Sequence, residues 1–209
     1  MMSITYLFEN ARAAGKTTQA MIEHFNRRTA EHIDLVRDYL LKIIDLNDPR
    51  LDKKILSQES IHHDESKFKD PELGPYVFVD HSYHMKDLGK KYNPPADIKQ
   101  QMQAATFHHI STNKHHADYW DKDLKMNNLN SKDRDKVPDK MVDATSMPLT
   151  YVASMVADWC SMSAEKKTDP YVWCEQNINK RWYFSDNQIK LIYDLLDKIW
   201  KTNKGGENG

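Results

Sequence analysis

The spacing of the apolar residues is the feature that most constrains how this chain can fold. Long segments carry apolar side chains at steps of three and four residues rather than in alternation, which is the period of an amphipathic α-helix. Glycine and proline, which interrupt helices, number only 6 and 8 among the 209 residues. The sequence therefore predicts an all-α fold. We expect a single helical domain over residues 17–200, with an N-terminal extension over residues 1–16 and a flexible tail over residues 201–209.

Start signals place the individual helices. The first is expected to run from a cap at Thr17 or Thr18 to about Ile44. Others are expected over residues 51–63 and from about residues 97, 148, 170 and 186, the last after a capping-box pattern at residues 185–188. Prolines and glycines punctuate residues 70–96, where we expect an irregular insertion, and the polar residues 127–140 are expected to form a surface loop.

Composition argues against several classes of protein. The 30 basic and 31 acidic residues nearly cancel, so we expect no extended nucleic-acid surface. No apolar run approaches the roughly 20 residues that span a bilayer, so we expect no membrane insertion. The two cysteines form no CxxC motif and the first residues show no export pattern. We therefore expect buried free thiols and a cytoplasmic protein, and the sequence leaves a homo-oligomer open.

Several polar residues fall on or beside the apolar faces of the expected helices. His32 lies on the stripe of the first helix, His109 on that of the helix from residue 97, and Asp158 on that of the helix from residue 148. The adjacent His63 and Asp64 end the second helix. Each alone is most simply a satisfied core or capping residue. Because burying one such group unpaired costs about 1–3 kcal/mol, several together imply either that they satisfy one another or that they share a metal ion, and we favour the metal site.

The residue types suggest which ions would bind. Imidazoles mixed with carboxylates suit Mn²⁺, Fe²⁺ or Zn²⁺, so the sequence predicts one or two divalent transition-metal ions. Lys67 follows His63 by four residues and Asp64 by three. If the helical path continues there, Lys67 is expected to lie on the same side and to neutralise a phosphate oxygen; otherwise it is an ordinary solvated lysine.

Three segments carry a resemblance to a known group of proteins. They read HDESKF at residues 63–68, HISTNKHH at residues 109–116 and MVADW at residues 155–159. They resemble the HDxSKF, HxxxNxHH and EMxxDW patterns of an uncharacterised family of phage and bacterial HD-like proteins. The order His32, His63-Asp64, Asp158 likewise resembles the signature of the HD-domain metal phosphohydrolase superfamily. The resemblance covers about residues 29–185 and implies an HD-domain-like bundle.

The resemblance also implies a set of metal ligands. A first ion would be held by His32, His63, Asp64 and Asp158. A second ion would be held by His109 and His116, with Asp64 bridging the two. The seven-residue step from His109 to His116 favours His116 over His115 only if the helix continues past Asn113. Where the family often has an acidic residue before Met155, this chain has Ser154.

The function implied is that of a metal-dependent phosphohydrolase. A metal-activated hydroxide would attack the phosphorus of a nucleotide or another small phosphate ester, either a monoester or a diester, with Asp64 and Lys67 as catalytic residues. If the protein is phage-encoded, it would act in the host cytoplasm. His84 and Arg181 are candidate substrate contacts; a solvated loop explains His84 equally simply, and a charge at a helix C-terminus explains Arg181.

Two other functions are compatible with the same residues. The first is a di-iron oxygenase of the HD fold, which the number of candidate ligands allows. The second is a non-catalytic nucleotide- or metal-binding module, with a role in phage–host conflict.

Overall fold

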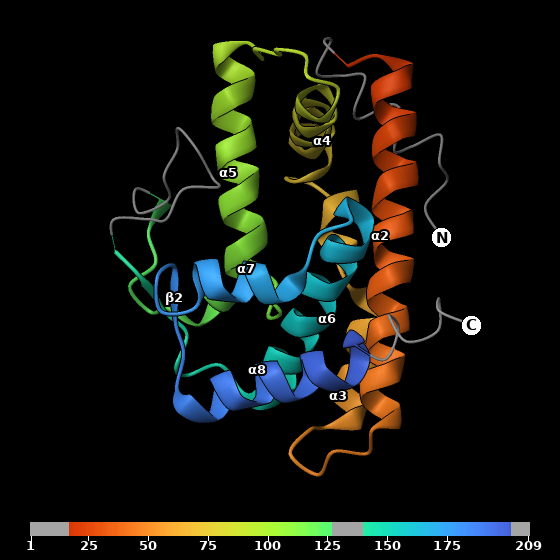
Figure 1. Cartoon of the computed structure of the whole chain (residues 1–209). Helices are drawn as coiled ribbons and strands as arrows, with labels where there is room; N and C mark the ends of the chain where they lie inside the picture. Colours follow the sequence, from red (N-terminus) through yellow and green to blue (C-terminus); the bar gives the residue numbers. More distant parts are fainter. Residues whose placement is uncertain (1–16, 127–139, 202–209) are drawn as a thin grey trace, which may run out of the picture. The chain divides into compact units, whose positions relative to one another are not determined.

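A computed structural model of the chain describes residues 17–126 and 140–201 (Figure 1). In this part of the chain the α-helices are α2 (Gln19–Asp45), α3 (Lys53–His62), α4 (Leu73–Asp87), α5 (Ala96–Thr112), α6 (Leu149–Lys166), α7 (Pro170–Asn177) and α8 (Asp186–Ile199). Shorter elements are the 3₁₀ helices η1 (Glu65–Phe68) and η2 (Ala117–Trp120) and the parallel strands β1 (Val142–Asp143) and β2 (Trp182–Tyr183). The predicted all-α fold is confirmed for these residues.

The chain forms two compact units, and each is described by itself. Unit 1 contains the residues up to Glu31 together with Asp64–His109, and unit 2 contains His32–His63 and the residues from Ile110 onward. The division falls inside α2 and inside α5. That the whole forms a single domain stays a prediction. The expected N-terminal extension, most of the expected surface loop and most of the expected tail lie outside the described residues.

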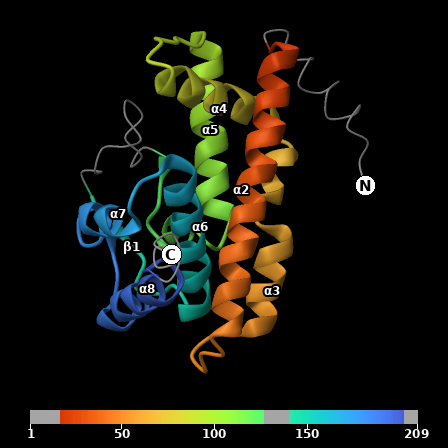
Figure 2. The same cartoon turned by 45° about the vertical axis from the view of Figure 1, so that its right-hand side comes forward.

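The core of unit 2 is built from helices that each bury one apolar face. The second part of α2 and α3 lie side by side, joined by a short turn (Figures 1 and 2). The most deeply buried side chains, each at most 1% exposed, include Val36, Leu40, Ile43, Leu56, Val152, Val156, Leu191, Ile192, Leu195, Leu196 and Ile199. Burying one such side chain fully contributes about 1.5–3 kcal/mol, so this packing is the main stabilisation of the unit.

Side-chain caps begin two helices of unit 2, and the one at α8 is the capping box that the sequence predicts. Asp52 accepts hydrogen bonds from the backbone N–H groups of Lys54 and Ile55 at the start of α3. Ser185 and Gln188 form the capping box at the start of α8. Gln188 is buried and also donates to the Met147 carbonyl at 2.7 Å, which fixes the start of α8 against the segment before α6.

The core of unit 1 corrects the expected irregular insertion. Helix α4 covers most of that segment and packs with the first part of α2 and with α5, burying Phe25, Val77 and Ile98. Gly74 and Pro75 lie in the first turn of α4, where a missing N–H or a flexible backbone disrupts no helical hydrogen bond. Within residues 70–96, only residues 70–72 before α4 and 88–95 between α4 and α5 lie outside a helix.

Two properties follow for the described part of the chain. None of its helices combines the length and the apolar character needed to cross a membrane. Both cysteines, Cys160 on α6 and Cys174 on α7, are free thiols and fully buried, as expected.

Candidate functional site

Unit 2 brings three of the predicted ligands together. His32 comes from α2, His63 directly follows α3, and Asp158 comes from α6. The His32 Nε2 atom lies 3.2 Å and the His63 Nε2 atom 3.9 Å from Asp158 Oδ1. One donor atom from each residue lies within 4.8 Å of the others, so the set could hold a metal ion.

The surroundings of this set favour a charged carboxylate. Burial alone would raise the pKa of Asp158, but the hydrogen bond from His32 and the charges of His32, His63 and His115 hold that pKa well below its usual range. The Ser161 hydroxyl orients the His32 ring, because it lies 3.3 Å from the second ring nitrogen, Nδ1. Two imidazoles and an ionised carboxylate therefore face one another on three helical elements.

Unit 2 also places His115 beside this set. The His115 and His63 rings lie 4.2 Å apart, and His115 is buried, whereas His116 is only partly buried. Helix α5 ends at Thr112, so the two-turn argument that favoured His116 does not apply. Ser, Thr and Asn side chains compete for backbone hydrogen bonds, which is a physical reason for the helix to end in this segment. His116 lies next to His115, with ring centroids 4.3 Å apart.

The acidic residue expected before Met155 has a substitute in unit 2. Glu59 on α3 accepts a hydrogen bond from the Ser154 hydroxyl at 3.1 Å, and its Oε2 lies 3.8 Å from His115 Nδ1. A carboxylate at this position can orient the His115 ring. Sequence reasoning missed Glu59 because its contacts lie 56 and 95 residues away along the chain, with no local pattern to mark them.

Unit 1 holds Asp64, Lys67 and His109. The backbone reverses at Asp64, whose φ of 57° lies in the left-handed region, which costs about 1–3 kcal/mol outside glycine. The α-helical path therefore does not continue, but η1 still turns Lys67 back onto the Asp64 carboxylate in an ion pair. His109 Nε2 lies 3.2 Å from the other oxygen of Asp64.

A second carboxylate in unit 1 was not predicted. Glu72 is fully buried, and its two oxygens lie 2.9 Å from His109 Nδ1 and 2.7 Å from His108 Nδ1. Ser66 donates a further hydrogen bond to Glu72 at 2.9 Å. Burial would raise the pKa of Glu72, but the hydrogen bond and charge of His109, together with the hydrogen bonds from His108 and Ser66, lower it overall. Glu72 thus fixes the His109 ring so that Nε2 faces Asp64.

The candidate substrate contacts lie in different units. His84 belongs to α4 in unit 1 rather than to a solvated loop, and its ring lies 4.1 Å from that of His24. Arg181 lies in unit 2 just before β2, with its guanidinium 5.4 Å from the Trp182 ring centre. Their contact with a substrate stays a prediction.

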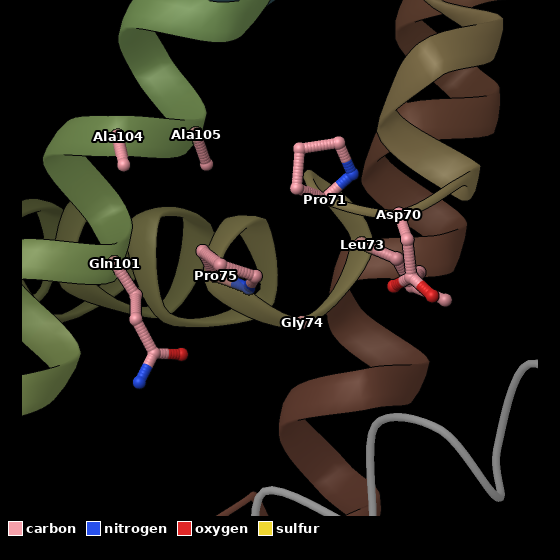
Figure 3. Close-up of a pocket in the computed structure, with 8 residues that line it drawn as sticks. All are labelled: Asp70, Pro71, Leu73, Gly74, Pro75, Gln101, Ala104 and Ala105. Atoms are coloured by element: carbon pink, nitrogen blue, oxygen red, sulfur yellow. The ribbon is translucent and has the colours of Figure 1, made fainter.

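Unit 1 also carries a surface hollow of about 350 Å³ between the start of α4 and α5 (Figure 3). Small and apolar residues predominate in its lining, which consists of Asp70, Pro71, Leu73, Gly74, Pro75, Gln101, Ala104 and Ala105. Ala105 lies one helical turn before His109 on the same face of α5. The hollow is thus a neighbour of the Asp64–Glu72–His109 cluster and does not include it.

Comparison with known proteins places the chain in a family. Residues 21–198 match the model of a family of unknown function, DUF5662. The chain belongs to this family. The match includes both buried histidine–carboxylate clusters, so they lie within the family's domain. No curated protein and no solved structure matches the chain.

Proposed function

We propose that this protein is a metal-dependent phosphohydrolase that acts on a nucleotide or another small phosphate ester. The observation that carries the proposal is the convergence of His32, His63 and Asp158 in unit 2, with donor atoms within 4.8 Å of one another. Three buried or half-buried groups from separate helical elements, one of them an ionised carboxylate, are more than a structural core requires. The HD-domain resemblance of the sequence adds the reaction class.

The donor set fits a divalent transition metal. Neutral imidazole and carboxylate donors together suit Zn²⁺, Mn²⁺ or Fe²⁺ better than Mg²⁺ or Ca²⁺, which prefer oxygen ligands. The Ser161 hydroxyl on His32 Nδ1 matches the usual arrangement around a metal ligand, in which the second ring nitrogen is held by a polar group. In unit 1, His109 has the same arrangement, with Glu72 on Nδ1 and an Asp64 oxygen near Nε2.

The residues would divide the work as follows. An ion bound by the His32 set would activate water for attack on phosphorus. In unit 1, Lys67, whose ammonium is paired with Asp64 and lies 5.5 Å from the Tyr76 ring centre, is the residue that we propose to bind a phosphoryl oxygen. Glu72 would hold His109 in one tautomer beside Asp64, which keeps that carboxylate oriented.

The test is a screen of protein loaded with Mn²⁺, Fe²⁺, Zn²⁺ or Mg²⁺ against phosphomonoesters, phosphodiesters and nucleotides. We expect release of phosphate or of a nucleoside product with at least one transition metal, and loss of that activity in both Asp158→Ala and Asp64→Ala. Asp34→Asn is the matched control because Asp34 is an exposed carboxylate on α2. Full metal content and activity in Asp158→Ala and Asp64→Ala would refute the proposal. Nucleotide binding without turnover would favour a binding module, and oxygen uptake by the iron-loaded protein would favour an oxygenase.

A further inference from the structure

Unit 1 contains another polar cluster, which the proposed reaction does not use. Asp80 on α4 is buried, and its two oxygens lie 2.6 Å from His24 Nδ1 and 3.1 Å from Arg28 Nη1, both on α2. The ring of His84 lies 4.1 Å from that of His24. Neither the Asp64–Glu72–His109 residues nor those of the hollow belong to this group.

Helix geometry explains why these side chains meet. His24 and Arg28 are four residues apart on α2, and Asp80 and His84 are four residues apart on α4. Residues at this spacing share a face of their helix. The first part of α2 and α4 pack together in the core of unit 1, so the two pairs face each other around the Asp80 carboxylate.

The Asp80 carboxylate orients the side chains of His24 and Arg28 and does not itself contact the bound molecule in this arrangement. Because Asp80 can only accept, His24 must donate its Nδ1–H to it, which leaves Nε2 as the nitrogen available to a ligand. Arg28 neutralises the Asp80 charge from the other oxygen. The side chains of His24 and Arg28 are 21% and 30% exposed, so a small molecule can reach them from solvent.

Among the described residues, the rings of His24 and His84 and the guanidinium of Arg28 lie on the α2 and α4 faces around Asp80. His81, next to Asp80 in the sequence and with its ring 4.7 Å from that of Tyr92, lies close enough to His84 and His24 to be affected by their charges. Burial and these like charges lower the pKa of His81. Among the described residues, this group is not one of those whose His and carboxylate atoms lie close enough together to hold a metal ion, and Arg28 can only donate, so the group suits an anion better than a metal ion.

We propose that His24, Arg28 and His84 form an oxyanion site that binds a phosphate group, either as inorganic phosphate or as the phosphate of a small molecule. Arg28 would donate its guanidinium N–H groups and contribute a fixed positive charge, and each imidazole would donate from its outward nitrogen when that nitrogen carries a proton. This site needs no metal and no hydrolysis. It therefore stands or falls separately from the proposed function.

The test follows the ring ¹H–¹⁵N signals of His24 and His84 in the full-length chain during titration with inorganic phosphate, with sulfate and with adenosine monophosphate in separate arms. The signals are assigned from His24→Gln and His84→Gln. We expect saturable shifts in the wild type and affinity about tenfold weaker in His84→Gln, which leaves the Asp80 contacts in place. His62→Gln, at an exposed histidine of α3, should bind as the wild type does. The amide spectrum reports whether each variant is folded.

The arms separate the sources of the anion and the competing explanations. Shifts with all three probes support a general oxyanion site, and stronger binding of adenosine monophosphate supports a small-molecule phosphate. Lys67→Gln should keep the response, because Lys67 belongs to the other cluster. Absent or non-saturating shifts, or equal affinity in the wild type and His84→Gln, would overturn the proposal. So would saturation of the same signals by one equivalent of Zn²⁺ without any phosphate response.

Discussion

The two buried histidine–carboxylate clusters use similar residues in different proportions. In unit 2, Asp158 faces the imidazoles of His32 and His63, and Glu165 lies farther off, 4.0 Å from the Nδ1 atom of His32. In unit 1 two carboxylates, Asp64 and Glu72, share one buried histidine, and a lysine already pairs with Asp64. The first set offers two imidazoles and one carboxylate that could bind a divalent cation, whereas in the second set the ammonium of Lys67 already pairs with a carboxylate. The ratio of carboxylate to imidazole therefore indicates the chemistry better than the presence of either residue type.

The largest expected effect is the loss of the only carboxylate in the unit 2 set. Asp158→Asn keeps the shape of the side chain but removes the charge that would hold an ion between the two imidazoles. We expect metal content to fall by one equivalent and hydrolysis to fall by about a thousandfold or more, measured by elemental analysis and product release. Unchanged metal content with an unchanged rate would place the ion elsewhere.

Removal of Glu72 tests the structural role of the unit 1 cluster. Glu72→Ala leaves His108 and His109 without their buried carboxylate, so the free energy of unfolding should fall by about 3–5 kcal/mol in urea denaturation. The control is Glu65→Ala, because Glu65 forms an exposed pair with Lys69 in the same unit and should cost less than about 1 kcal/mol. An equal fall in the free energy of unfolding of both variants would show that the buried Glu72 pairs stabilise the fold no more than an exposed ion pair does.

Variants of the adjacent His115 and His116 test which of the two belongs with His32, His63 and Asp158. His115→Ala removes a buried ring beside His63 and should weaken metal binding about 10–100-fold, measured by competition with a chromophoric chelator. His116→Ala should change it less. The reverse order would restore His116 as the ligand and make the contact between Glu59 and His115 incidental.

Lys67 tests whether the cation of unit 1 serves a phosphate. Lys67→Gln should reduce the rate about 10–100-fold and leave the metal content of the His32 set unchanged. A parallel loss of metal would mean that Lys67 acts on the ligands instead. Lys69→Gln, at the exposed partner of Glu65, provides the control.

The smallest expected effect is a difference in how stability depends on pH between the buried Glu72 carboxylate and the more exposed ion pair of Asp48 and Arg50. The pKa of Glu72 is lower in the folded than in the unfolded chain, so its contribution is complete above the ordinary pKa of 4.5 and is lost as the pH falls through the folded value. Glu72→Gln should therefore flatten the loss of stability on acidification.

The matching prediction for the more exposed pair concerns Asp48. The Arg50 hydrogen bond lowers the pKa of Asp48 to about 2. Asp48→Asn should therefore reduce the free energy of unfolding by only about 1 kcal/mol above pH 3.8, and this difference should vanish towards pH 2. Urea denaturation across this range measures both.

Periodic patterns predicted the fold well because they reflect local rules. The buried stripe that contains His32 and the capping box of Ser185 and Gln188 both appear as expected. Helix α4 was missed because Gly74 and Pro75 suggest a loop, although both fit the first turn of a helix. The breaker residues of this segment lie at the ends of the helix rather than within it.

The candidate site was predictable only in part. Asp158 could be identified as a carboxylate on an apolar face, and the same reasoning applied to Asp80 would have found the His24 cluster. Glu72 could not be identified this way, because its partners His108 and His109 lie 36 and 37 residues away along the chain. Asp64 was expected with the His32 set and as the bridge to a second ion held by His109 and His116; within unit 1, the structure pairs Asp64 with His109.

The burial of the two cysteines has a practical consequence. Burial raises the pKa of Cys174 to about 12 and that of Cys160 further still, so almost no thiolate forms at neutral pH. The folded chain is therefore unreactive towards maleimides and other thiol reagents. A cysteine introduced at an exposed position would be the sole site of attachment for a dye or spin label, without removal of either natural residue.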